Sequence, residues 1–208
     1  MEKAIDLVIL ASGYGRRLRP LTYLLPKVLA PVRRFRLIEW VYITSFRSDL
    51  LFRTIIHASN GSVFGFAVTK FPFAYSPSKI PTGTASPLKY IDTSHKLSDQ
   101  FIVRNGDTIS NIDLKKMLAY HKRRKADVTV FTKDDAINSG GTYILNKRIL
   151  DYIPNQLSLD INTFLIPKLL SRGDVKVSCY NPKGSWYMDC GTWPGLIRAW
   201  IKLPSMKW

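Results

Sequence analysis

The chain has 208 residues, of which 46% are hydrophobic and 22% are charged, and it contains 12 glycines and 12 prolines. These values are typical of a globular protein with a sizeable core, so we expect residues 1–208 to form a single domain. No apolar run reaches the roughly 18 residues that span a membrane, and the two cysteines, Cys179 and Cys190, lack the spacing of a disulfide framework or a zinc site. We therefore expect a cytoplasmic protein without a membrane partner.

The charge balance is strongly basic. The 31 lysines and arginines outnumber the 15 aspartates and glutamates, which gives a formal net charge of +16 at pH 7. Such a balance favours anionic partners. The basic residues gather in separate clusters at 33–36, 115–116 and 122–125, and no recognisable nucleic-acid-binding motif accompanies them. A solvated basic exterior is the favoured interpretation, and weak electrostatic binding of nucleic acid stays open as an alternative.

The first half of the chain alternates strand-like and helix-like segments. The apolar run over residues 5–11 predicts a buried strand, and the segment 37–46, which is apolar all round, predicts a buried helix. Further strands are expected over 53–58 and 66–70. Four prolines, at positions 72, 77, 81 and 87, then predict loops, with a short helix over 86–90.

The alternation continues in the second half. Strands are expected over 101–103, 128–131, 142–145 and 175–180, and helices over 112–125 and 160–171. Asp113 near the start of the helix 112–125 and the basic residues at its end both suit the helix dipole. A terminal helix over 196–203 is expected to pack Trp200 against the sheet. This order of elements predicts a layered α/β fold with a mainly parallel sheet.

The segment after the first strand has the features of an anion-binding loop. Gly13 and Gly15 let the backbone turn sharply and bring its N–H groups close to an anion. Arg16, Arg17, Arg19 and Lys27 add positive charge near the same point. Two glycines alone would also fit an ordinary strand-to-helix turn with surface arginines, since short glycine motifs are weak signals. The longer string from Leu7 to Thr22, closed by Pro26-Lys27, is more specific.

That string resembles the signature of the sugar-1-phosphate nucleotidyltransferases, L-A-A-G-x-G-T-R-L-x-P-L-T followed by P-K. Two residues depart from it. Ser12 stands where the family usually has Ala or Gly, and Arg16 stands where it usually has Thr or Ser. Five further segments resemble family motifs in the same order, at 81–85, 105–107, 140–145, 158–170 and 186–193. The pattern is most similar to the short mannose- and heptose-1-phosphate guanylyltransferases, with the glucose-1-phosphate thymidylyltransferases as the neighbouring type.

The resemblance implies a three-layer αβα fold with a Rossmann-like, mainly parallel sheet, of the nucleotide-diphospho-sugar transferase type. It also implies one nucleotidyltransferase domain over residues 1–208. The implied enzyme transfers a nucleotidyl group from an NTP to a sugar 1-phosphate, which gives an NDP-sugar and pyrophosphate. Such chemistry depends mainly on positioning the reactants and neutralising their charge.

The resemblance assigns roles to individual residues. Asp107 and Asp189, each after a strand, match the family's metal positions, and Mg²⁺ commonly takes one or two carboxylates together with phosphate oxygens and water. The catalytic positions are Arg17 and Lys27. The nucleotide-binding positions are Ala11, Ser12, Gly13, Gly15, Arg16, Thr82 and Gly83, and the sugar-phosphate-binding positions are Asn105, Gly106 and Gly141.

One family feature has no counterpart. After the strand 128–131 the family runs through a hairpin and an E-K-P motif that grips the sugar phosphate, whereas only residues 132–139 intervene here. A non-catalytic nucleotide-binding or regulatory relative therefore stays open as an alternative, as does a basic nucleic-acid-associated protein on the same scaffold. Aromatic residues near the C-terminus, Trp193, Trp200 and Trp208, leave a homo-oligomer interface open as well.

Overall fold

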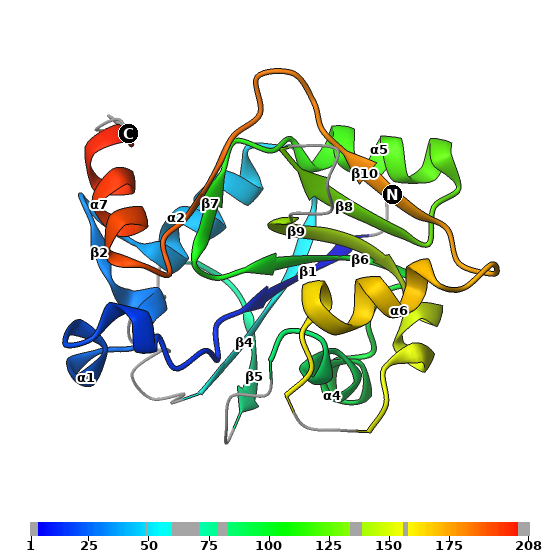
Figure 1. The fold of residues 1–208 in the computed structure, drawn as a ribbon, viewed down its shortest axis with the longest axis horizontal. Helices are drawn as coiled ribbons and strands as arrows, with labels where there is room; N and C mark the ends of the chain where they lie inside the picture. The colour runs from blue at the N-terminus through cyan, green and yellow to red at the C-terminus, as the bar shows by residue number, and fades with distance from the viewer. Residues whose placement is uncertain are drawn as a thin grey trace.

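A seven-stranded sheet forms the centre of the computed structural model, with the strand order β10-β8-β9-β6-β1-β4-β5 (Figure 1). The structure describes residues 4–48, 50–59, 71–78, 83–133, 139–155 and 158–203. Only β9 runs antiparallel to its neighbours, which confirms the mainly parallel sheet. The strands are β1 Ile5–Leu10, β4 Phe52–Ser59, β5 Ala74–Ser78, β6 Gln100–Asn105, β8 Val128–Thr132, β9 Ser139–Asn146 and β10 Val177–Tyr180.

Helices cover both faces of this sheet. One face packs against α2 Leu37–Phe46 and α5 Leu114–Arg124. The other packs against α4 Ser86–His95, α6 Ile166–Leu170 and two shorter turns, η3 Lys147–Tyr152 and η4 Ile161–Leu165. Side chains along β1 alternate between the two faces, so Leu7 and Ile9 enter one core and Val8 the other. The apolar run in the sequence therefore reflects a strand buried on both sides, and the three-layer αβα architecture is confirmed.

A smaller assembly lies beside the sheet. It contains the ribbon of β7 Thr108–Ser110 and β11 Tyr187–Asp189, the hairpin of β2 Pro31–Val32 and β3 Phe35–Arg36, the helices α1 Leu21–Leu24 and α7 Trp193–Lys202, and the turns η1 Arg16–Leu18 and η2 Lys27–Leu29. A third apolar cluster, which includes Trp40 and Leu196, holds these elements to α2. Trp40 also donates a hydrogen bond from Nε1 to the carbonyl of Val32 at 3.0 Å.

Several expectations need correction. The stretch expected to form loops contains β5, because Pro77 lies in an edge strand, where a missing N–H is tolerated. Helix α4 extends to His95, beyond the expected residue 90. The expected helix 160–171 is divided into the π-helical turn η4 and the short α6. The expected strand 66–70 lies outside the described residues.

The C-terminal helix exists, but the expectation for Trp200 is wrong. Leu196, Ala199 and Leu203 pack into the third cluster, whereas Trp200 is 53% exposed. Residues 196, 199 and 203 lie on the buried side of α7, and Trp200 lies off that side. None of the helices in the described ranges is both long and apolar enough to cross a membrane.

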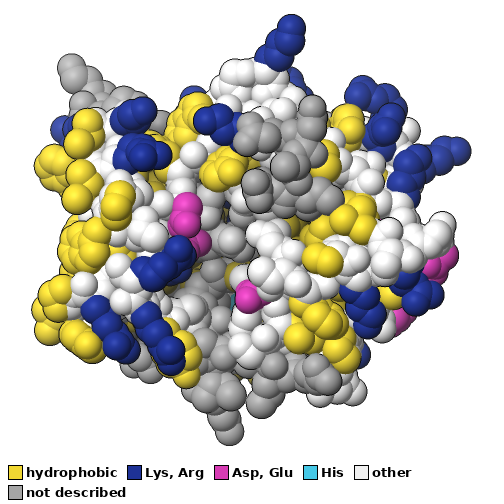
Figure 2. Space-filling view, viewed as in Figure 1, with side chains coloured by type: hydrophobic (Ala, Val, Ile, Leu, Met, Phe, Trp, Pro, Cys, Tyr) yellow, Lys and Arg dark blue, Asp and Glu magenta, His cyan; other side chains and the backbone are white. Residues whose placement is uncertain are grey.

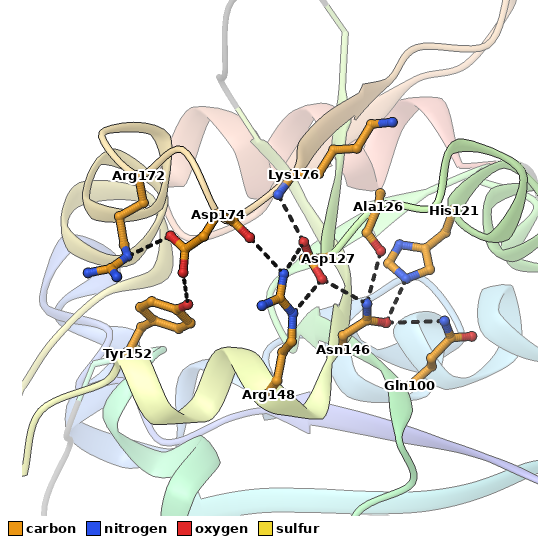
Figure 3. Close-up of polar contacts among 10 residues, drawn as sticks. All are labelled: Gln100, His121, Ala126, Asp127, Asn146, Arg148, Tyr152, Arg172, Asp174 and Lys176. Carbon is orange, nitrogen blue, oxygen red and sulfur yellow. Dashed lines mark hydrogen bonds and ion pairs between the residues drawn. The ribbon is translucent and has the colours of Figure 1, made fainter.

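Polar side chains connect β8, β9 and β10 at the end of the sheet where β8 and β10 begin. The Asp127 carboxylate accepts hydrogen bonds from the Arg148 guanidinium at 2.7 and 2.6 Å and from the backbone N–H of Lys176 at 2.9 Å (Figure 3). These bonds, led by the one from Arg148, lower the pKa of Asp127 to about 2. Asp127 therefore stays charged and holds the chain before β10 against the turn η3. Nearby, buried His121 bonds to Thr129 and Asn146.

His57 in β4 provides a test of the buried core. The side chain is 2% exposed, its Nδ1 lies 3.1 Å from Ser76 Oγ, and its Nε2 has no hydrogen-bond partner within the described residues. Burial lowers the pKa of His57 from 6.5 to about 4. Below pH 6.5 the unfolded chain therefore binds a proton that the folded protein excludes.

We expect the free energy of unfolding to fall by up to about 3 kcal/mol between pH 7 and pH 4 because of His57. Urea unfolding at a series of pH values measures this slope. The His57→Gln variant should show a shallower slope, with a remainder from His121, whose pKa burial also lowers. An unchanged slope in His57→Gln would contradict the assignment.

Candidate active site

The carboxyl ends of β1 and β6 approach each other closely and form the floor of the site. The N–H of Gly106 donates to the carbonyl of Leu10 at 2.8 Å, and the N–H of Ala11 donates to the carbonyl of His57 at 2.7 Å. A Cβ on Gly106 would lie only 2.9 Å from the Leu10 oxygen. Glycine at 106 therefore allows the two strand ends to meet, and ligands of open α/β sheets bind at such strand ends.

The glycine-containing loop turns above this floor. Gly15 has a φ of 63°, and a Cβ there would lie 2.8 Å from Thr22 Cγ2 and 2.9 Å from Lys27 Cβ. Thr22 donates from its hydroxyl to the Gly15 carbonyl at 2.9 Å. The turn η1 that follows carries Arg16 and Arg17. The Arg16 guanidinium lies over the exposed ring of Tyr14, 5.2 Å from its centre.

Four of the predicted residues converge next to this loop. Lys27 Nζ forms an ion pair with the Asp107 carboxylate, and Arg17 Nη2 lies 3.8 Å from Asp189 Oδ2. The Lys27 and Asp107 side chains are 15% and 14% exposed, whereas those of Arg17 and Asp189 are 65% and 51% exposed. The inner pair is thus partly withdrawn from water, and the outer pair faces the solvent.

Gly191 lies at the point where three of these side chains meet. A Cβ on Gly191 would lie 2.9 Å from Asp189 Oδ1, 3.0 Å from Asp107 Oδ2 and 3.1 Å from Arg17 Nη2. The Gly191 N–H donates to Asp189 Oδ1 at 2.8 Å. Any side chain at 191 would fill the space between the two carboxylates and the guanidinium, so the glycine leaves room there for a bound atom.

The position of Asp189 differs from the expected arrangement in one respect. It ends β11, which belongs to the two-stranded ribbon with β7 and not to the main sheet. The ribbon is joined to the strand end at Asp107, because the N–H of Cys190 donates to the Asp107 carbonyl at 2.9 Å. Burial, together with the charges of Asp107 and Asp189, raises the pKa of the Cys190 thiol to about 12. Cys190 is therefore a buried, protonated side chain.

The donor set suits a hard divalent cation. Two carboxylate oxygens face one point, and no group of three or more His, Cys, Asp or Glu side chains gathers within the described residues. Mg²⁺ is commonly held by one or two carboxylates and takes its other ligands from phosphates and water. Asp107 and Asp189 therefore fit Mg²⁺ better than they fit a zinc site, which usually takes three or four protein ligands.

A cleft with a volume of about 170 Å³ opens beside the ion pairs. Figure 2 shows a hollow in this face, with acidic atoms on both of its sides and basic atoms next to one of them. Seven predicted residues line the cleft: Ala11, Ser12, Gly13, Lys27, Gly83, Asn105 and Asp107. Gly15, Arg16, Arg17, Gly106, Gly141 and Asp189 do not line it. Thr82 lies outside the described residues.

Three of the predicted glycines have visible packing roles. Besides Gly106, Gly83 has a φ of 73° and packs directly on the backbone of Leu159, while Gly141 has a φ of 67° and packs on Thr108. A Cβ on Gly141 would lie 2.9 Å from Thr108 Oγ1. Direct contact of these glycines with a nucleotide or a sugar stays a prediction.

Two cleft residues were missed by sequence reasoning. Asp160 Oδ1 accepts hydrogen bonds from the backbone N–H of Thr84 at 3.2 Å and from its hydroxyl at 3.1 Å. Both residues line the cleft. Their signal is present in the motifs at 81–85 and 158–170, but the pairing joins segments that are 76 positions apart.

Asn105 adds an acceptor to the same cleft. Its Oδ1 is buried and has no hydrogen-bond partner in the part of the chain that the structure describes. A buried oxygen of this kind usually has a partner, so its position favours a ligand that donates a hydrogen bond.

The sequence is similar to a known protein family and to individual named relatives. The sequence profile of the nucleotidyl transferase family matches residues 6–140. The chain is 29% identical over 98% of its length to a provisionally named mannose-1-phosphate guanyltransferase of Sulfolobus acidocaldarius, and 26% identical over 94% of its length to the mannose-1-phosphate guanylyltransferase of Mycobacterium tuberculosis. It covers 64% and 63% of those two proteins, so it spans less than two thirds of their length.

A solved structure shares the fold. The crystal structure of HddC from Yersinia pseudotuberculosis has a TM-score of 0.77 and 20% sequence identity, over 96% of this chain and all of that one. The sequence match over residues 6–140 covers more than half of the chain, and the chain belongs to the nucleotidyl transferase family.

Proposed function

We propose that this chain transfers a nucleotidyl group from an NTP to a sugar 1-phosphate, and that residues 1–208 act as one nucleotidyltransferase domain. The observation that carries the proposal is the convergence of Arg17, Asp107 and Asp189 at Gly191, with Lys27 paired to Asp107. The names of the Sulfolobus and Mycobacterium relatives support the reaction class. Location in the cytoplasm stays a prediction.

The proposed reaction exchanges one phosphorus–oxygen bond for another. A phosphate oxygen of the sugar 1-phosphate attacks the α-phosphorus of the NTP, and the bond from that phosphorus to the bridging oxygen of the β-phosphate breaks. Pyrophosphate leaves with the bonding electron pair, and the nucleotidyl group stays on the sugar phosphate. The protein's task is to hold two anions together and to stabilise the charge on the leaving group.

The described residues are suited to that task. Ser12 and Gly13 line the cleft and offer their backbone N–H groups to a triphosphate, and Lys27 lines the same cleft. Arg17 is exposed at the rim, where a guanidinium can contact phosphate oxygens. Arg16, predicted to bind the nucleotide, lies over Tyr14 and does not line the cleft.

Mg²⁺ is the proposed cofactor, with Asp107 and Asp189 as its protein ligands. When bound, it would supply positive charge between the phosphates of the two substrates. In the structure Lys27 contacts Asp107 Oδ2, one of the two carboxylate oxygens that lie next to Gly191. Lys27 is therefore expected to leave this carboxylate when a cation binds and to move toward the phosphates.

Two other residues that line the cleft suit the hydroxyl groups of a sugar. The buried Asn105 Oδ1 is an acceptor without a partner among the described residues, and the Asp160 carboxylate has further acceptor capacity beyond its bonds to Thr84. A sugar provides several hydroxyl donors for such acceptors. These residues offer a way to hold the acceptor without the family's E-K-P motif.

Substitution of Asp107 tests the proposed metal site. The variant Asp107→Asn keeps the size of the side chain and removes its charge, so we expect pyrophosphate release to fall about 100-fold or more. The assay pairs each NTP with a panel of hexose and heptose 1-phosphates in the presence of Mg²⁺. Thermal unfolding of the same sample shows whether the fold is kept.

Asp113→Asn is the matched control, because Asp113 caps α5 and asparagine is an equally good cap. It should keep wild-type activity. Full activity in Asp107→Asn would contradict the assignment of the metal site. No turnover with any pair, together with nucleotide binding in calorimetry, would favour the non-catalytic relative.

Substitution of Lys27 tests its contact with the same carboxylate. Because its ammonium group competes with a cation for Asp107, Lys27→Met should bind Mn²⁺ several-fold more tightly than the wild type when no nucleotide is present. Free Mn²⁺ measured by electron paramagnetic resonance gives the affinity. The same variant should lose about 100-fold in turnover. Weaker Mn²⁺ binding by Lys27→Met would show that Lys27 does not compete for this site.

A further inference from the structure

One side of the molecule carries large apolar side chains in the open. They come from α1 and α7 and are 38% to 86% exposed: Tyr23, Leu24, Trp193, Ile197, Trp200 and Ile201. In Figure 1 both helices lie along the same side, and Figure 2 shows hydrophobic and basic atoms alternating there. Isolated exposed apolar residues need no explanation, but a group of this size usually marks a binding surface.

The spacing on α7 shows that these residues form a second apolar stripe. Leu196, Ala199 and Leu203 face the core. Trp193, Ile197, Trp200 and Ile201 follow the i, i+4, i+7, i+8 pattern of a separate helical face. The helix is therefore apolar on two sides, and only one of them is covered by the described protein.

Contacts join the two helices into one surface. Trp193 donates from Nε1 to the carbonyl of Arg19 at 3.0 Å. Arg33 donates to the carbonyls of Trp200 at 2.6 Å and Ile201 at 3.0 Å, and its guanidinium lies 5.5 Å from the Trp200 ring centre. Arg19 lies 4.9 Å from the ring centre of Tyr23.

The charged residues within the segments that form this surface, 14–36 and 193–203, are all positive. Apart from Arg17, which pairs with Asp189, the exposed basic side chains of these segments are Arg16, Arg19, Arg33, Arg34, Arg198 and Lys202. Neither the segment 14–36 nor the segment 193–203 contains an aspartate or a glutamate. We refer to the six apolar and six basic residues together as the basic aromatic face.

We propose that the basic aromatic face docks on an anionic membrane surface. Interfacial helices combine Trp and aliphatic residues on one side with Lys and Arg beside them, so that the apolar groups enter the headgroup region while the cations meet lipid phosphates. The stripe on α7 and the flanking Arg198 and Lys202 have this arrangement. Docking of this kind needs no spanning helix, so the proposal departs from the expectation of no membrane partner, which rests on spanning segments alone.

Other occupants fit these residues less well. Two copies that met through this face would bring two sets of six positive charges together, which is unfavourable. Nucleic acid would satisfy the cations, but bases stack on aromatic rings and would leave Leu24, Ile197 and Ile201 uncovered. A membrane surface satisfies both the positive charge and the aliphatic groups.

Vesicle flotation tests the proposal. The wild-type chain should float with phosphatidylcholine vesicles that contain roughly a third phosphatidylglycerol, at least about tenfold more than with pure phosphatidylcholine, and salt should weaken the binding. The double variant Ile197→Gln with Ile201→Gln should reduce binding about tenfold. Arg198→Gln with Lys202→Gln should do the same.

Matched controls separate this face from general stickiness and charge. Leu51→Gln with Leu170→Gln removes two other exposed leucines, and Arg123→Gln with Arg124→Gln removes two charges from the other basic cluster. Both should bind vesicles as the wild type does. Equal loss in the controls, or no flotation of the folded wild type, would overturn the proposal.

If the proposal fails, two further measurements identify what binds the basic aromatic face instead. If the wild type sediments as a dimer and the double variant Ile197→Gln with Ile201→Gln sediments as a monomer, the face binds a second copy of this chain. If the wild type binds a random DNA duplex but no vesicles, and Arg198→Gln with Lys202→Gln weakens the DNA binding, the face binds nucleic acid.

Discussion

The buried guanidinium of Arg104 is the constraint on which the arrangement of the site depends. Arg104 lies in β6, is fully buried, and donates to the carbonyl of Val41 and to the hydroxyls of Thr44, Ser45 and Ser110. None of these partners is a carboxylate, and burial lowers its pKa to about 10, so the group stays charged near neutral pH. Because a buried charge is costly without hydrogen bonds, α2 and β7 must keep their positions against β6.

Strand β7 pairs with β11, which ends at Asp189, and β6 ends two residues before Asp107. The two carboxylates are thus placed by a residue that touches neither of them.

The local charge balance of the site runs against that of the whole chain. The protein has a formal charge of +16, yet its strand ends present two carboxylates, each matched by one cation. These cations keep Asp107 and Asp189 compensated in the free protein and are the groups that phosphates would attract. The less exposed pair, Lys27 and Asp107, is the stronger of the two, because partial burial reduces screening by water, whereas the exposed pair of Arg17 and Asp189 contributes little.

The sequence predicts the fold well where one physical cause dominates. Helix 37–46 and the inner strands were predictable because elements buried on both sides leave long apolar runs. Strands β7 and β11 were not, because three residues carry no period and pair with partners nearly 80 positions away. Strand β5 was missed because Pro77 argues against a strand unless the strand lies at a sheet edge, which depends on the tertiary arrangement. Four central site residues were named through a family signature, whereas the pairing of Thr84 with Asp160 depends on a contact between distant segments.

Trp200 shows most clearly where sequence reasoning stops. The segment 193–203 is so rich in Trp, Ile and Leu that all of it suggests a core helix. Apolar periodicity predicts that a face is covered, but it does not distinguish the protein's own sheet from an outside surface. The structure makes that distinction, since Leu196, Ala199 and Leu203 are buried while Trp200 and Ile201 are not. The residues that misled the prediction about the core are therefore those that carry the inference about a docking surface, and the basic side chains around them favour an anionic one.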